Sequence, residues 1–242
     1  MKRCWYLWVV LFVYSPVASA GNILCPLKPD PPPAIDGNLS EWYQSPGGFE
    51  IEEENVTWGK AKWQGEADLS GTLWLYWDKN FIYLAADIVD DVFIQDKSGK
   101  DLWLGDHLEF DLDPEYKPGA KGIFTDKQFM MGFSPGNLQN TGDPLFDMLP
   151  EYYIWAPADK EDANINVAAL RTEKGYTLEA RIPWGLFGIK PKQGMILGID
   201  LHISDTDTPG SQDTYTTLFP EKWTGRKLER LIPVKLGDTS GK

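Results

Sequence analysis

The segment from residue 107 to residue 113 reads HLEFDLD, in which polar and apolar residues alternate. Because successive side chains of a strand point to opposite faces, this segment would bury one face and present carboxylates and a histidine on the other. Trp103 precedes it in a short loop that contains Gly and Asp. A tryptophan beside hydrogen-bond acceptors suits a sugar ring, whose C–H groups stack on the indole while its hydroxyls bind carboxylates. The alternative for this stretch alone is a core tryptophan next to a solvated strand face.

Two further segments carry polar rows of the same kind. The segment MILGIDLHIS (195–204) places Asp200 and His202 on one face, and QFMMGF (128–133) places Gln128, Met130 and Gly132 on one face. If these strands are neighbours of the first one, Glu109, Gln128, Asp200 and His202 converge on one concave surface, which is the usual form of a small-molecule site.

The amino-terminal twenty residues have the order of a secretory signal peptide. Lys2 and Arg3 come first, an apolar run spans residues 5–14, and a small-residue ending closes at Ala20. This apolar run is too short to cross a bilayer as a mature anchor. We therefore expect cleavage after Ala20, a secreted or periplasmic protein, and no membrane insertion.

The charge balance excludes several classes of partner. The chain holds 36 acidic and 23 basic residues, a formal net charge of −13, and the predicted cleavage would remove two basic residues. Such a protein repels phosphate backbones and anionic lipid surfaces, so we expect no nucleic-acid partner. Cys4 lies in the predicted signal and Cys25 then has no partner, so no disulfide framework is expected.

The pattern of short β segments predicts the fold class. About ten segments rich in β-branched and aromatic residues are separated by turn signals, and no long 3.6-residue period occurs. We expect an all-β, antiparallel β-sandwich of jelly-roll type. The expected boundaries are a signal peptide (1–20), a Pro-rich linker (21–33), one domain (34–236) and a tail (237–242). The expected strands are 72–77, 81–89, 107–113, 128–133, 152–155, 165–171, 176–182, 195–204, 215–219 and 231–236.

Five phrases in a fixed order carry a family resemblance. They are AIDG with Trp42, LWLYWDKNFIYLAADIVDD, DHLEFDLD, GYTLEARIPW and LGIDLHISD. In this order they resemble carbohydrate-binding module family 9 and its DOMON-like relatives, over roughly residues 34–236. The resemblance implies a β-sandwich without catalysis that binds a mono- or oligosaccharide or a polysaccharide chain end, alone or as a partner in an exported assembly.

The resemblance also implies site residues. In the family, two loop tryptophans sandwich a sugar over one sheet face, and these match Trp103 and, by its position before the last strand, Trp223. The carboxylate on the following strand matches Glu109. The chain departs from the family at Met130 and Gly132, where sugar-binding members carry an arginine and an asparagine, so two hydrogen-bond partners are missing there.

Metal and haem sites are further implications of the resemblance. Family members bind structural calcium, and the acidic segment from Asp87 to Asp106 offers oxygens, although it lacks the spacing of an EF-hand and no ligand set can be assigned. Some DOMON-like relatives carry b-type haem in electron transfer. Met130 and His202 are the pair that would ligate the iron under that alternative.

Glycoside hydrolysis is a third hypothesis, in which Glu109 would act with Asp111 or another acid. Glu109 and Asp111 would stand ~6.5–7 Å apart on one strand face, a separation that inverting hydrolases use. Alternating acids on a strand are more often a polar row, and we expect no catalysis. The sequence assigns no role to Trp58, Trp63 and Trp155.

Overall fold

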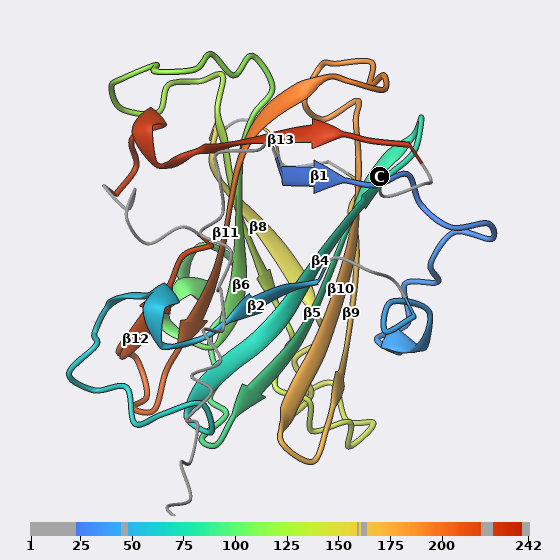
Figure 1. The fold of residues 1–242 in the computed structure, drawn as a ribbon. Helices are drawn as coiled ribbons and strands as arrows, with labels where there is room; N and C mark the ends of the chain where they lie inside the picture. Colours follow the sequence, from blue (N-terminus) through green and yellow to red (C-terminus); the bar gives the residue numbers. More distant parts are fainter. Residues whose placement is uncertain (1–22, 45–47, 159, 161–163, 219–224, 239–242) are drawn as a thin grey trace, which may run out of the picture.

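Strands with apolar faces build two sheets that stack on each other (Figure 1). The computed structural model describes residues 23–44, 48–158, 160, 164–218 and 225–238. The eight-stranded sheet has the order β1-β13-β11-β6-β7-β8, with β12 beside β11 and β3 beside β12. The five-stranded sheet has the order β2-β4-β5-β10-β9. The all-β sandwich expected from the sequence is confirmed.

Most strands lie within a few residues of their predicted positions. The eight-stranded sheet consists of β1 (Ile23–Cys25), β3 (Val56–Trp58), β6 (His107–Asp113), β7 (Phe129–Ser134), β8 (Glu151–Ala156), β11 (Ile196–Asp205), β12 (Thr214–Thr216) and β13 (Ile232–Leu236). The five-stranded sheet consists of β2 (Phe49–Ile51), β4 (Leu69–Trp77), β5 (Phe81–Asp90), β9 (Asn166–Arg171) and β10 (Gly175–Pro183). Short 3-10 helices are η1 (Leu39–Glu41), η2 (Glu53–Asn55), η3 (Gly99–Leu104) and η5 (Leu228–Arg230).

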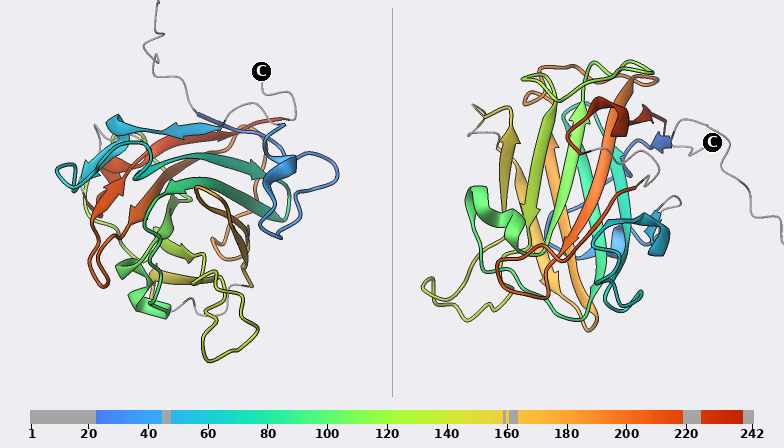
Figure 2. Two further views of the ribbon diagram at one scale, coloured as in Figure 1. Left: turned by 90° about the horizontal axis from the view of Figure 1, so that it is seen from below. Right: turned by 90° about the vertical axis from the view of Figure 1, so that its left-hand side faces the viewer.

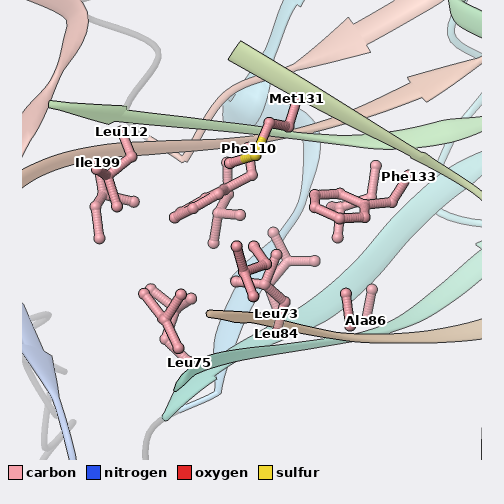
Figure 3. Packing of buried hydrophobic residues seen from close by; sticks show 14 of the residues in the cluster. Leu73, Leu75, Leu84, Ala86, Phe110, Leu112, Met131, Phe133 and Ile199 are labelled. Atoms are coloured by element: carbon pink, nitrogen blue, oxygen red, sulfur yellow. The ribbon is translucent and has the colours of Figure 1, made fainter. Parts of the chain in front are cut away.

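The hydrophobic core lies between the two sheets. Phe110 and Leu112 of β6 point from the eight-stranded sheet toward Leu73 and Leu84 of the five-stranded sheet (Figure 3). All four side chains are fully or almost fully buried. Since the apolar parity of β6 enters this core, its polar parity faces the opposite side of the sheet.

Three short strands lie where the sequence showed none. β1 falls within the expected Pro-rich linker and pairs in parallel with β13, while β2 and β3 fall between residues 44 and 66, where no strand was expected. Strands of three residues are too short to display an alternating pattern. Cys25 ends β1 fully buried in the core, and burial raises the pKa of its thiol, so this cysteine has a packing role.

The two ends of the chain lie outside the residues that the structure describes. The predicted signal and cleavage after Ala20 fall within residues 1–22, and most of the predicted tail falls within residues 239–242, so both stay predictions. In the described part of the chain, no helix has the length and apolar character needed to cross a membrane.

The segment around η1 covers the outer face of the five-stranded sheet. Trp42 is buried there and stacks on Tyr76, with ring centroids 4.7 Å apart. Glu179 of β10 holds this segment, because its carboxylate accepts hydrogen bonds from Trp42 Nε1 (2.6 Å), Gly37 N (2.7 Å) and Asp36 N (3.1 Å). Burial nevertheless raises the pKa of Glu179 to about 7.

We expect Glu179→Gln to destabilise the fold by about 1–2 kcal/mol, because an amide has one acceptor oxygen and leaves a buried N–H donor poorly paired. The urea midpoint should fall without a change in slope. Glu173→Gln, in the exposed turn before the same strand, is the matched control. Equal midpoints for the two variants would contradict this role of Glu179.

Candidate functional site

The three strands that carry the polar rows are neighbours in the eight-stranded sheet. In the right-hand view of Figure 2, which looks onto the eight-stranded sheet, β6 runs between β11 and β7. Glu109 pairs with His202 on one side and Gly132 on the other, and the next pair along β6 joins Asp111 to Asp200 and Met130. The row is buried: Glu109 is 4% exposed and Asp111 is fully enclosed. The solvated-face explanation is therefore wrong.

A buried network connects these carboxylates to one arginine. Arg230 of η5 forms an ion pair with Asp111, and its Nη2 lies 3.2 Å from Glu109 Oε1. His202 Nε2 lies 3.3 Å from Asp111 Oδ2, and its Nδ1 lies 3.0 Å from the Thr216 carbonyl. The network therefore fixes the polar face and leaves neither nitrogen of His202 free.

Tyr215 of β12 completes this network. Its ring stacks on His202, with centroids 4.8 Å apart, and its hydroxyl donates to Glu109 Oε1 at 3.0 Å. Burial raises the pKa of Asp200 to about 6. Burial would also raise the pKa of Glu109, but His202, Arg230 and the Tyr215 hydroxyl outweigh it and hold that pKa below its usual range. Glu109 is thus an ionised acceptor at neutral pH.

A pocket of about 660 Å³ opens above this face. Glu109 and Met130 line it from β6 and β7, and four aromatic side chains form much of its remaining surface. The aromatic residues are Trp58, Trp103, Trp155 and Tyr215. Trp58 is 44% exposed and Trp103 is 42% exposed. An open cavity with broad apolar walls and a few fixed polar groups is suited to a small polyhydroxylated ligand.

Local structure holds Trp103 at the rim. η3 is anchored by Leu102, which is fully buried, so that the next side chain turns toward the pocket. Trp155 of β8 donates from Nε1 to the Lys100 carbonyl at 3.0 Å, and Gly99 N donates to Glu151 Oε1 at 3.1 Å. These bonds join η3 to β8 and place Trp103 and Trp155 along one side of the pocket.

Trp58 reaches the same pocket from the other edge of the sheet. It lies in β3, whose register places it opposite Tyr215 of β12. β12 in turn pairs with β11. The polar floor therefore lies between two aromatic walls that come from opposite ends of the sheet.

Gly132 explains part of the departure from the family pattern. A Cβ atom at this position would lie 2.3 Å from the Trp155 ring and 2.7 Å from a Leu102 methyl carbon. The absence of a side chain thus lets Trp155 lie over β7. At this position the protein has an aromatic surface in place of an amide.

We expect Gly132→Ala to displace Trp155 and weaken ligand binding by ~3- to 10-fold, with a stability cost of about 1 kcal/mol from overpacking. Titration calorimetry and thermal unfolding separate the two effects. Gly185→Ala is the matched control, because a Cβ there meets no atom within 4 Å. An affinity loss no larger than that of the control would contradict the steric role of Gly132.

The structure brings only part of the predicted site to the pocket. Trp103 and Glu109 line it, whereas Asp200 and His202 lie in the buried network beneath. Gln128 does not reach it, because its side-chain oxygen accepts from Thr125 N (3.0 Å) and Thr125 Oγ1 (2.9 Å). Trp223 lies outside the described residues.

Several lining residues were missed by sequence reasoning. They are Trp58, Trp155, Tyr215, Gln212, Arg226 and Arg230. The three aromatic residues are large rings in short β segments, which is a sequence signal for a binding surface. The face of the sheet on which each ring lies, however, cannot be assigned until the strand pairing is known. No local pattern marks Arg230, which ends the three-residue 3-10 helix η5 before β13.

The haem and hydrolase hypotheses each pair a residue that lines the pocket with one that is buried. Met130 lines the pocket, but His202 is fully buried and both of its nitrogens lie near oxygen atoms. Asp111, the second carboxylate of a hydrolase, is fully buried and paired with Arg230. In the Met130–His202 pair and in the Glu109–Asp111 pair, one member lines the pocket and the other is buried beneath it, and the arrangement is suited to binding.

A separate acidic cluster fits a hard cation. Asp90, Asp106 and Asp205 each place a carboxylate oxygen within 4.8 Å of the others, and all three side chains are buried. Asp68 and Asp207 form a second such group with Asp205. Oxygen atoms of Asp205 and Asp68 are buried without a hydrogen-bond partner in the described structure. Of these five aspartates, Asp90 and Asp106 belong to the segment from Asp87 to Asp106 in which the sequence suggested calcium ligands, and the other three lie elsewhere in the chain.

Burial raises the pKa values of this cluster. The pKa of Asp205 rises to about 8 and that of Asp90 to about 6, and the pKa of Asp106 rises because burial and the nearby Asp90 and Asp205 carboxylates disfavour its charge. Clustered carboxylate oxygens are the hard ligands that calcium takes in proteins. The residues present therefore fit the structural cation that the family resemblance implies.

Comparison with known proteins gives consistent matches. The family described as carbohydrate family 9 binding domain-like matches residues 35–227. A family 9 carbohydrate binding module from Caldicellulosiruptor kristjanssonii in complex with cellotriose superposes with a TM-score of 0.67 at 17% identity, over 91% of this chain and 95% of that one. The same organism's family 9 module in complex with glucose gives a TM-score of 0.64 at 18% identity, over 92% and 98%.

A curated relative is a much larger protein. Endo-1,4-beta-xylanase A of Thermotoga maritima is 24% identical over 180 residues, which are 74% of this chain but 14% of the xylanase. The chain thus spans about one-seventh of that relative's length.

Proposed function

Because the chain belongs to the carbohydrate family 9 binding domain-like family, we propose that it is a secreted, non-catalytic carbohydrate-binding module whose pocket holds a sugar against the tryptophans of the eight-stranded sheet. One observation carries this proposal. Trp58 and Trp103 are the tryptophans with the largest exposed fraction in the described chain, and both line the pocket that Glu109 also lines. A contiguous patch of exposed apolar surface beside polar groups marks a ligand-binding groove or an interaction site.

The ligand class follows from the chemistry of the pocket. The indole faces take the C–H faces of a pyranose, and the ionised Glu109 accepts a hydroxyl hydrogen. The related modules are complexed with cellotriose and glucose, so a β-glucan segment or chain end is the first candidate. Trp223, beyond the described residues, stays a candidate for a further stacking surface.

The proposed test is a binding screen of the chain from Gly21 onward. Affinity electrophoresis against soluble β-glucan, xylan and mannan, with calcium present, should retard the protein in at least one polysaccharide. Methionine and histidine ligands of haem would instead give a Soret band in the purified protein. Absence of retardation in every gel would contradict the proposed function.

Calcium is a second part of the proposal. Asp90, Asp106 and Asp205 would hold one cation and thereby fix the ends of β5 and β11 beside the residue that precedes β6. The cation would supply charge compensation for buried carboxylates and no chemistry at the pocket. With the xylanase relative in view, the proposal includes a place for this chain beside a catalytic partner in an exported assembly.

A further inference from the structure

Arg230 is a buried cation at the floor of the pocket. It is 2% exposed, and its Nη1 donates to the Gly225 carbonyl at 3.0 Å. Its other terminal nitrogen contacts Glu109 and Asp111, and the guanidinium lies 5.4 Å from the centre of the Phe124 ring. One side chain therefore links the two acids of β6 to the segment before η5.

Glu109 is the one of these two acids that reaches the pocket. Both hydrogen bonds that its carboxylate accepts, from the Tyr215 hydroxyl and from Arg230, go to Oε1. Within the described residues, Oε2 accepts none. Met130 at the neighbouring position of β7 lines the pocket with a thioether and supplies no strong donor. The carboxylate is thus fixed through one oxygen and offers the other to a ligand.

We propose that Arg230 is a positioning residue of this site, which orients the Glu109 carboxylate and keeps it available to accept a hydroxyl of the ligand. This inference rests on the proposed function and specifies which side chains make its hydroxyl recognition work.

A purely structural role is the competing explanation. Buried acids need a cation, and removing one partner of a buried ion pair is costly whether or not a ligand binds. The two explanations differ in their pH dependence. If Arg230 acts through Glu109, its loss lets Glu109 take up a proton at a higher pH, and binding then weakens as the pH falls.

Other groups that face Glu109 also titrate or carry charge. They are His107 and Asp111 on β6, Asp200 and His202 on β11, and Tyr215 on β12. The ratio of the two affinities at each pH removes what these groups contribute equally to wild type and variant, and it reports the change at the two carboxylates that Arg230 contacts, Glu109 and Asp111.

The experiment measures the dissociation constant of the full chain for the retained glucan or its oligosaccharide between pH 5 and pH 7.5. We expect Arg230→Gln to weaken binding about tenfold at pH 7, with a ratio to wild type that widens at least ~3-fold by pH 5. Arg230→Lys keeps the charge and should keep the wild-type pH profile at reduced affinity. Thermal unfolding checks that each variant folds.

Arg226→Gln is the matched control, because Arg226 is an exposed pocket cation of the same segment and should change affinity by a pH-independent factor. The inference is overturned if the ratio of the Arg230→Gln dissociation constant to that of the wild type is the same at every pH. It is also overturned if Arg230→Gln binds with wild-type affinity. If Arg230→Gln does not fold, Arg230→Lys provides the test. The inference is overturned if Arg230→Lys binds with wild-type affinity, or if the pH profile of its affinity is shifted from that of the wild type. A wild type that binds no sugar contradicts the proposed function itself, and this inference with it.

Discussion

Trp103→Ala should weaken sugar binding about 30- to 150-fold, which corresponds to about 2–3 kcal/mol. The indole is 42% exposed at the rim of the pocket and contributes an apolar surface that only a ligand would cover. Its removal deletes the stacking surface without opening a cavity in the core. Leu102 remains to anchor η3, so the melting temperature should change little.

The control for this variant is Phe146→Ala. Phe146 is an exposed aromatic residue between β7 and β8, and it does not line the pocket. Titration calorimetry should give wild-type affinity for the control. Equal affinities of Trp103→Ala and wild type would place the ligand elsewhere and contradict the site.

Calcium should raise the melting temperature by about 5–10 °C at a concentration 100 times its dissociation constant. A ligand at that concentration that binds only the native state adds about 2.7 kcal/mol to the free energy of unfolding. For a chain of this length each kcal/mol shifts the transition by about 2–4 °C. Differential scanning calorimetry with calcium, and after chelation by EDTA, measures the difference.

The sign of the pH dependence follows from the raised pKa values. Asp205, with a pKa of about 8, and Asp90, with a pKa of about 6, hold protons in the native state that the unfolded chain has released. Without calcium, the free energy of unfolding should therefore fall as the pH rises from about 4 to about 8. Because the cation needs deprotonated carboxylates, its stabilisation should be larger at pH 8 than at pH 5.

Asp205→Asn should abolish most of the calcium effect, whereas Asp96→Asn, an exposed acid of the loop before η3, should preserve it. A melting temperature that is independent of calcium at both pH values would show that the acidic cluster holds no cation.

The fold was predictable because long strands carry their own pattern. β6 and β11 alternate over seven and ten residues, and their apolar parities enter the core as expected. β1 and β3 have three residues each, and their places depend on pairing with β13 and β12, which are distant in the sequence. Tertiary contacts decide such segments, and a local pattern cannot.

The site was predictable to the extent that it follows strand parity. Glu109, Asp200 and His202 do share one face, but parity does not say which of them another side chain covers. Tyr215 stacks over His202, and so only Glu109 reaches the pocket. The aromatic wall at Trp155 depends on the absence of a side chain at Gly132 one strand away, a relation that appears only in three dimensions.

The most direct test of the account is the indole region of a ¹H–¹⁵N correlation spectrum during titration with cellotriose. The chain has 11 tryptophans, and single Trp→Phe variants assign their Nε1–H signals. We expect the signals of Trp58 and Trp103 to move together with one dissociation constant, while those of the buried Trp42 and Trp184 stay in place. Saturable binding that leaves Trp58 and Trp103 unperturbed would contradict it.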